Sequence, residues 1–198
     1  TYNLSTLTIP STINVVISNG SKLEIADKAI VRFNGPFTAG LHQAFAGAGD
    51  AHFGPGAVGE VYPQWWGASA ASSDSSPAIN KAINSAPSLP GVNVRLTGNF
   101  NCKTTIHVNR HRVKLTGDGM YSTQLTFDPV TPMPLIEFSH PDKSVIAQCA
   151  IRDIGLLAVG AYKDTKRVQK IGIRIVDADI MEVRNVAIHN WGGSQSIG

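Results

Sequence analysis

Apolar residues along this chain follow two periodic patterns, and the commoner one is that of short β-strands. Apolar and polar residues alternate over a few positions, and each run ends at Gly, Pro, Asn or Asp. Clear examples lie at 22–25, 124–127 and 172–176. Because such runs recur before and after residues 62–91, the pattern predicts an all-β protein.

The second pattern is helical and occurs once, at 76–86. Its apolar residues form a stripe along one side of a helix: Ala78, Ile79, Ala82, Ile83 and Ala86. Ser76 or Asp74 can cap the first free amides, and Pro77 suits the first helical position because it has no amide hydrogen to leave unpaired. We therefore expect one short amphipathic helix at 77–86, lying on an apolar surface.

A weak internal repeat appears late in the chain. The segment 150–156 (AIRDIGL) resembles the segment 182–188 (EVRNVAI), which follows 32 residues later. Repeats of ~20–50 residues are typical of solenoids and propellers. Short strands without crossover helices favour a β-solenoid over a doubly wound sheet, and in a solenoid each coil is stable only when stacked on its neighbours.

The order of motifs resembles a known family. An apolar β segment precedes 62–68 (YPQWWGA), which is followed by a loop containing Asp74, the Ala-Ile-x-x-Ala-Ile helix and 113–119 (V-x-L-x-G-x-G). This order resembles the N-terminal part of right-handed parallel β-helix proteins of the pectate-lyase-like superfamily. Bacteriophage tailspikes and secreted polysaccharide lyases and hydrolases belong to that superfamily. The resemblance covers 58–127, and extends to 146–192 by the repeat pattern alone.

The resemblance implies an all-β fold, a right-handed parallel β-helix (solenoid) with one short N-terminal capping α-helix. The parts would be an N-terminal β segment at 1–61, the Trp-Trp-Gly-Ala loop and capping helix at 62–91, and the first coils at 92–198. Two departures stand out. The loop 69–76 lacks the Gly-Asp-Gly and paired aspartates common in relatives, and the sequence stops at Gly198 after few coils. We therefore expect the chain to be a portion of a longer protein.

The function implied by the resemblance is polysaccharide processing, as a glycan lyase or glycoside hydrolase of the tailspike or secreted type. It further implies a homo-oligomer, a trimer in tailspikes, and an extracellular, secreted or virion-surface location. The competing hypothesis is a non-enzymatic structural or adhesive β-helix module of a virion or cell surface. A carbohydrate-binding β-sandwich is a third hypothesis, disfavoured by the helix and by the 32-residue repeat.

The composition and charge of the chain indicate which classes of partner to expect. The formal net charge is only +3, and the basic residues are scattered, so no nucleic-acid-binding patch is expected. No apolar run has the length of a membrane-spanning helix. Cys102 and Cys149 are predicted to be two buried thiols, with a mutual disulfide as the alternative. No Cys/His spacing predicts a metal site.

Three acidic residues are weak candidates for catalysis. Asp177 and Asp179 flank Ala178 between two strands, and Glu182 follows closely. Glycoside hydrolysis needs two carboxyl groups, one as acid and one as base or nucleophile. Aspartates in turns more often bond to their own backbone, so a structural role is the favoured interpretation. No cofactor is evident. The resemblance allows calcium, although the sequence has no dense Asp/Asn/Gly loop of the kind that binds it.

His189, Asn190 and Trp191 are weak candidates for contacting a polysaccharide, because they follow a strand and precede two glycines. A structural role, such as an Asn ladder inside the solenoid, is favoured here too. Trp65 and Trp66 could stack on sugar rings, but adjacent aromatics beside a Pro and before Gly-Ala more often pin a loop to the core. For the same reason Asp74 is interpreted as a helix cap and not as an acid.

Overall fold

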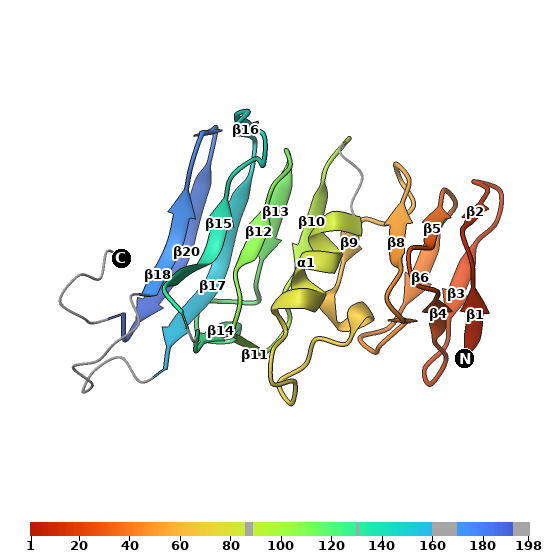
Figure 1. Cartoon of the computed structure of the whole chain (residues 1–198), viewed down its shortest axis with the longest axis horizontal. Coiled ribbons are helices and arrows are strands. Elements are labelled where there is room, and N and C mark those ends of the chain that lie inside the picture. The colour runs from red at the N-terminus through yellow and green to blue at the C-terminus, as the bar shows by residue number, and fades with distance from the viewer. Residues whose placement is uncertain (86–88, 130, 160–169, 192–198) are drawn as a thin grey trace.

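The computed structural model describes residues 1–85, 89–129, 131–159 and 170–191. Within them the protein is mostly β, with one α-helix, and every strand pairing is parallel. The predicted all-β class with a single short helix is therefore confirmed. The molecule is elongated, with the N-terminus at one end and the last strands at the other (Figure 1).

The first 66 residues contain nine short strands and a 3-10 helix, η1. Their bounds are β1 Tyr2–Leu4, β2 Leu7–Ile9, β3 Val15–Ile17, β4 Leu23–Ile25, β5 Ile30–Phe33, β6 Phe37–Ala39, β7 Phe45–Ala46, β8 Asp50–Phe53, β9 Glu60–Val61 and η1 Pro63–Trp66. Pairing runs in the orders β1-β4-β7, β2-β5-β8 and β3-β6. The segment predicted as N-terminal β at 1–61 is thus a stack of parallel strands, and its Asn-Gly and Pro signals mark bends, not antiparallel hairpins.

The remaining strands form longer parallel sheets after the helix. Their bounds are β10 Val92–Arg95, β11 Phe100–Cys102, β12 Ile106–Val108, β13 Val113–Thr116, β14 Gln124–Phe127, β15 Met133–Phe138, β16 Ile146–Ala147, β17 Ala150–Ala158, β18 Lys170–Ile175, β19 Ala178–Asp179 and β20 Glu182–His189. The long sheet has the order β9-β10-β13-β17-β14-β11, with β20 also paired to β17. Separate sheets join β12-β15-β18 and β16-β19.

The sequence repeat sets the register of the two longest paired strands. Ile151 lies beside Val183, Arg152 beside Arg184, and Leu156 beside Ile188. The two copies of the repeat therefore stack residue on residue. In a parallel pair this places like side chains on the same face, which is why the apolar positions of both copies coincide.

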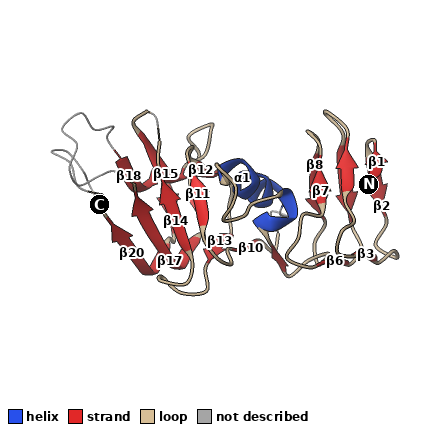
Figure 2. Ribbon diagram, turned by 90° about the horizontal axis from the view of Figure 1, so that it is seen from below, coloured by secondary structure: helices blue, strands red, loops and turns tan. Residues whose placement is uncertain are grey.

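The helix α1, Ser76–Ser85, begins where the sequence predicts and lies between the two groups of strands. Asp74 Oδ1 accepts the amides of Ser76 and Lys103, each at 3.0 Å, so Asp74 caps the helix and also ties it to β11. Ala86, the last predicted helical residue, lies outside the described residues. α1 contacts β8 and η1 on one side and β12 on the other. Figures 1 and 2 show strands on both sides of it, those of the N-terminal segment on one side and those of the longer sheets on the other.

Aromatic side chains fill the core next to α1. Trp65 is 3% exposed, and its indole N–H donates to the Gly40 carbonyl at 2.9 Å. Trp65 packs edge-on against Phe37, and Trp66 packs on Phe45, with ring centroids 5.2 and 5.1 Å apart. The two tryptophans therefore anchor the loop to the N-terminal stack, as the packing interpretation predicts.

Both cysteines are buried free thiols, and burial raises the pKa of Cys102 to about 12 and the pKa of Cys149 above its ordinary value.

The burial of α1 predicts a large effect of truncating its apolar stripe. Ile83 is fully buried, so Ile83→Ala should lower the free energy of unfolding by about 2–5 kcal/mol. Asn84 is exposed on the next position of the same helix, and Asn84→Ala should change it by less than about 0.5 kcal/mol. Chemical denaturation of both variants is the measurement. Equal effects of the two substitutions would contradict the placement of the helix.

Candidate functional site

The outer face of the long sheet carries polar side chains in rows that run from strand to strand. Apolar residues point inward at alternate positions, for example Val113 and Leu115, and the residues between them point outward. Parallel register then aligns the outward residues across the sheet. One row contains Glu60, Asn93, Lys114 and Glu182, with the buried Ala150 between the last two, and the next contains Arg95, Thr116, Arg152 and Arg184. We call these residues the outer polar rows.

The three arginines of the outer polar rows are paired with carboxylates, either within the rows or beside them. Arg95 Nη2 lies 2.6 Å from Asp118 Oδ1. Arg152 bonds to Glu182 Oε2, and Arg184 Nε lies 3.3 Å from Glu182 Oε1. The side chain of Arg184 is 58% exposed, so it remains accessible while it is paired.

A stacked pair of left-handed residues bends the sheet. Asp153 and Asn185 have φ of 57° and 52°, a region that Asn and Asp tolerate better than most residues. Asn185 Nδ2 donates to Asp153 Oδ1 at 2.8 Å across 32 residues of sequence. On one side of this corner β17 pairs with β13, and on the other side it pairs with β14. The sheet therefore presents two connected panels.

An aromatic pair lies beyond the corner. Tyr121 is 70% exposed, and its ring centroid lies 6.2 Å from that of His189. His189 is at the end of a row that also contains Asn101, Thr126 and Leu157. Exposed rings beside amide and hydroxyl groups combine a flat apolar surface with hydrogen-bond partners. We call Tyr121 and His189 the aromatic platform.

The predicted catalytic carboxylates have separate structural roles. Asp177 adopts φ of 48° at a turn, and its carbonyl accepts the Ile146 amide at 2.9 Å. Asp179 Oδ1 accepts the amide of Ile180 at 2.8 Å. Glu182 is held by Arg152, which lowers the pKa of its carboxyl group. A general acid needs a raised carboxyl pKa, so the charge around Glu182 favours an ion-pair role over acid catalysis.

The predicted polysaccharide-contacting residues are divided between surface and core. Trp191 is 7% exposed, stacks on Phe127 at 5.8 Å and donates from its indole N–H to the Leu156 carbonyl at 3.2 Å. Asn190 is exposed with φ of 62°. Only His189 of the three lies in the aromatic platform. Glu182 and His189 stand at opposite ends of β20, about 20 Å apart at the rise of a strand, so the two predicted sets do not form one site.

The sequence analysis did not identify the residues that make this face aromatic and charged. Tyr121 is a lone residue in a turn, and no local pattern marks it as exposed beside a strand that begins 61 residues later. Arg152 and Arg184 could have been found, because they occupy the same position in both copies of the repeat. A charged residue at the same outward position of each repeat predicts a row of charges across the stacked strands.

No group of three or more His, Cys, Asp or Glu side chains among the described residues could hold a metal ion. No helix in the described part of the chain has the length and apolar character needed to cross a bilayer.

Comparisons with known proteins give one structural likeness. No family model and no curated protein matches this chain. The solved structure of ORF18 of Geobacillus virus E2 is similar, with a TM-score of 0.55 and 20% sequence identity. The match covers 65% of this chain and 25% of that phage protein, so the similarity concerns the fold of a part of it.

The ion pairs of Glu182 predict its titration. In the folded protein its carboxyl group should titrate below the ordinary value of 4.5, because Arg152 stabilises the carboxylate. Stability from this pair is present above the unfolded pKa and is lost as pH falls through the lowered folded pKa. Carboxyl ¹³C NMR should show the Glu182 pKa rising towards 4.5 in Arg152→Met and staying unchanged in Arg95→Met. An unchanged value in Arg152→Met would show that the pair does not form.

Proposed function

We propose that this chain is part of a virion-associated or secreted protein that processes polysaccharide, and that its own contribution is glycan binding along the outer face. In this proposal the parallel strands are coils of a right-handed β-helix of the pectate-lyase-like type, and the assembled protein is an extracellular trimer. The observation that carries the proposal is the set of in-register outer polar rows next to the aromatic platform.

A repeated polymer suits a surface that is itself periodic. Within each row, neighbouring residues are separated by the spacing of neighbouring strands, ~4.8 Å, so successive strands offer side chains at regular intervals along the direction of stacking. In this proposal the partly exposed hydroxyl groups of Thr116 and Thr126 exchange hydrogen bonds with sugar hydroxyls. The exposed ring of Tyr121 supplies an apolar surface for the carbon face of a sugar. Such a surface binds each sugar unit weakly, and its affinity for the polysaccharide rises when several units bind at once.

The alternative is a structural or adhesive module without catalysis, and one observation favours it. Asp177 lies at a turn where its main-chain carbonyl accepts the Ile146 amide, the Asp179 carboxylate accepts a local amide, and the Glu182 carboxylate is in an ion pair. None of these arrangements provides the acid and base pair that glycoside hydrolysis requires. In the enzymatic version of the proposal, catalytic groups therefore come from outside the described residues. The likeness to a phage protein is compatible with both versions.

Incubation with a panel of bacterial polysaccharides tests the proposal. A lyase would release unsaturated sugars that absorb in the ultraviolet, and a hydrolase would release saturated oligosaccharides. Binding without cleavage by the longest available form of the protein would favour the adhesive module. Neither binding nor cleavage of any polysaccharide would refute the proposed function.

Truncation of the aromatic platform gives a sharper test of the binding face. For a polysaccharide that binds, Tyr121→Ala should weaken affinity by about tenfold, equivalent to ~1.4 kcal/mol. Tyr2 is a matched control, because its side chain is 69% exposed at the N-terminal end of the molecule, against 70% for Tyr121. Tyr2→Ala should leave the affinity unchanged in isothermal titration or affinity electrophoresis. If both variants bind like the parent protein, the aromatic platform is not the binding surface.

A further inference from the structure

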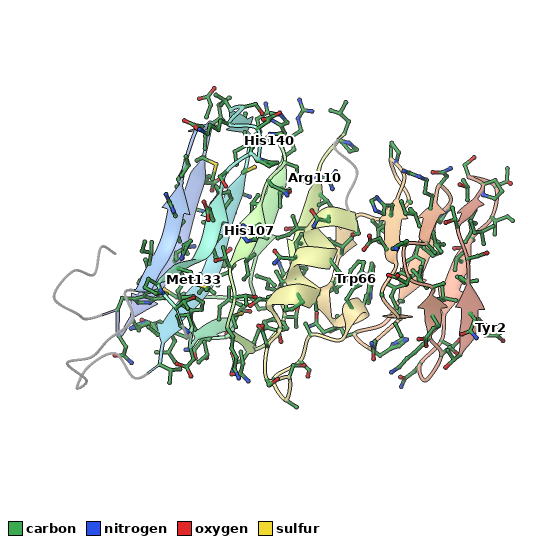
Figure 3. All side chains as sticks on the ribbon, in the orientation of Figure 1. Tyr2, Trp66, His107, Arg110, Met133 and His140 are labelled. Atoms are coloured by element: carbon green, nitrogen blue, oxygen red, sulfur yellow. The ribbon has the colours of Figure 1, made fainter. Side chains whose placement is uncertain are left out.

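A polar cleft lies on the side of the molecule where α1 meets the strands on either side of it. Its volume is about 600 Å³, within the usual range of small-molecule sites. Four separate chain segments line it: β8, α1, the turn between β12 and β13, and the turn after β15. The lining residues are Asp50, His52, Lys81, Asn84, Asn109, Arg110, His111, His140 and Pro141. Figure 3 shows Arg110 and His140 near one another on the upper side of the molecule, midway along its length.

Basic groups dominate this lining. Lys81 and Arg110 are cations, Asp50 is the single acidic residue among the lining residues, and three imidazoles can become cations. Lys81 Nζ is 3.9 Å from Asp50 Oδ1 and donates to the Gly49 carbonyl at 2.9 Å. These bonds hold the ammonium group in place at the edge of the cleft.

The C-terminal end of α1 faces the cleft, and by itself it would repel an anion through the helix dipole. Arg110 Nη1 donates to the last carbonyls of the helix, those of Ile83 at 3.3 Å and Asn84 at 2.9 Å. Its positive charge thus lies directly against the negative end of the helix. The guanidinium offsets the dipole and brings a fixed cation to the wall of the cleft.

His52 acts as a reporter of the potential inside the cleft. Burial is the largest cause of the lowered pKa of His52. The positive charges of Arg32 and Arg110 also lower this pKa, and the negative charge of Asp50 raises it. The remaining titratable neighbours are Lys81 on α1, His111 in the turn after β12, and His140. His140 is bonded to Asp142, which also accepts the Ser144 amide at 2.9 Å. Burial and the two arginines thus disfavour the imidazolium form of His52 in the empty cleft.

We propose that this cleft binds a tetrahedral oxyanion, phosphate or sulfate, either free or as an ester group of a larger ligand. Side chains that can donate hydrogen bonds line it from four chain segments, which suits a group whose oxygens point in several directions better than a planar carboxylate. The site lies apart from the outer face of the long sheet, so this inference does not depend on the proposed function.

Binding should be linked to proton uptake by His52. An anion in the cleft favours the imidazolium form, so it raises the pKa of His52 relative to the empty site. Affinity should consequently increase as pH falls from 8 to 6, because the bound state then holds more protons than the free state. Sulfate is the better probe, since its own charge does not change over this range, whereas a phosphate monoester titrates near pH 6.

The test is a titration of the 198-residue protein with sodium sulfate at constant ionic strength, followed by imidazole ¹H–¹⁵N NMR. We expect saturable shifts at His52, His111 and His140, tighter binding at pH 6 than at pH 8, and no shift at His107, which is exposed on β12 outside the cleft lining. A parallel titration with a hexose phosphate separates the two sources. Tighter binding of the ester than of inorganic phosphate would assign a phosphorylated saccharide, and equal affinity would assign the free ion.

Two variants and a control make the result specific. His52→Gln should reduce sulfate affinity at pH 6 by about tenfold and flatten its pH dependence. Asn84→Asp keeps every cation and adds an exposed carboxylate, so it should weaken binding at both pH values. His107→Gln should behave like the parent protein. Shifts spread over all six imidazoles without saturation, or equal effects of His52→Gln and His107→Gln, would overturn the proposal.

Discussion

The in-register parallel stacking of strands is the constraint on which the rest of this structure depends. Parallel neighbours cannot be joined by a tight hairpin, so the chain must travel around before each strand meets its partner. Every inward residue then rests on an inward residue of the next strand, as Leu115 does on Ile151. The same rule aligns the outward residues, so a binding surface arises from rows of side chains that are distant in sequence. Arg95, Thr116, Arg152 and Arg184 form such a row without any local motif.

The helix α1 interrupts this stacking and creates the second distinctive region. It lies between the short N-terminal strands and the longer sheets, and its apolar stripe packs on η1 and on strands on both sides. Its polar side chains bond to the segments on both sides. Lys81 donates to the carbonyls of residues 47–49, and Asn80 accepts the His107 amide at 2.8 Å. The cleft lined by His52 and Arg110 exists because these junctions leave polar groups of four segments facing one space.

The sequence predicted those elements whose signals lie within a short stretch of the chain. The stripe at 78, 79, 82 and 83 gave the helix, Asp74 was correctly interpreted as its cap, and the repeated AIRDIGL and EVRNVAI segments gave the register of β17 and β20. The pairing of the strands in 1–61 was not predicted, because the Asn-Gly and Pro signals there mark bends without specifying which strands pair. Tyr121 with His189, and His52 with His111 and His140, meet only through the stacking itself, and no spacing in the sequence records those contacts.

The most direct test of the stacking is the pattern of cross-strand nuclear Overhauser effects between backbone protons of β17 and β20. In the parallel register, Ile151 contacts Val183 and Leu156 contacts Ile188, so every contact joins residues with the same separation along the chain. A constant separation over the whole length of both strands is the result predicted here. Contacts in which the partner number falls as the residue number rises would mean antiparallel pairing, and would contradict both the aligned rows and the surfaces built from them.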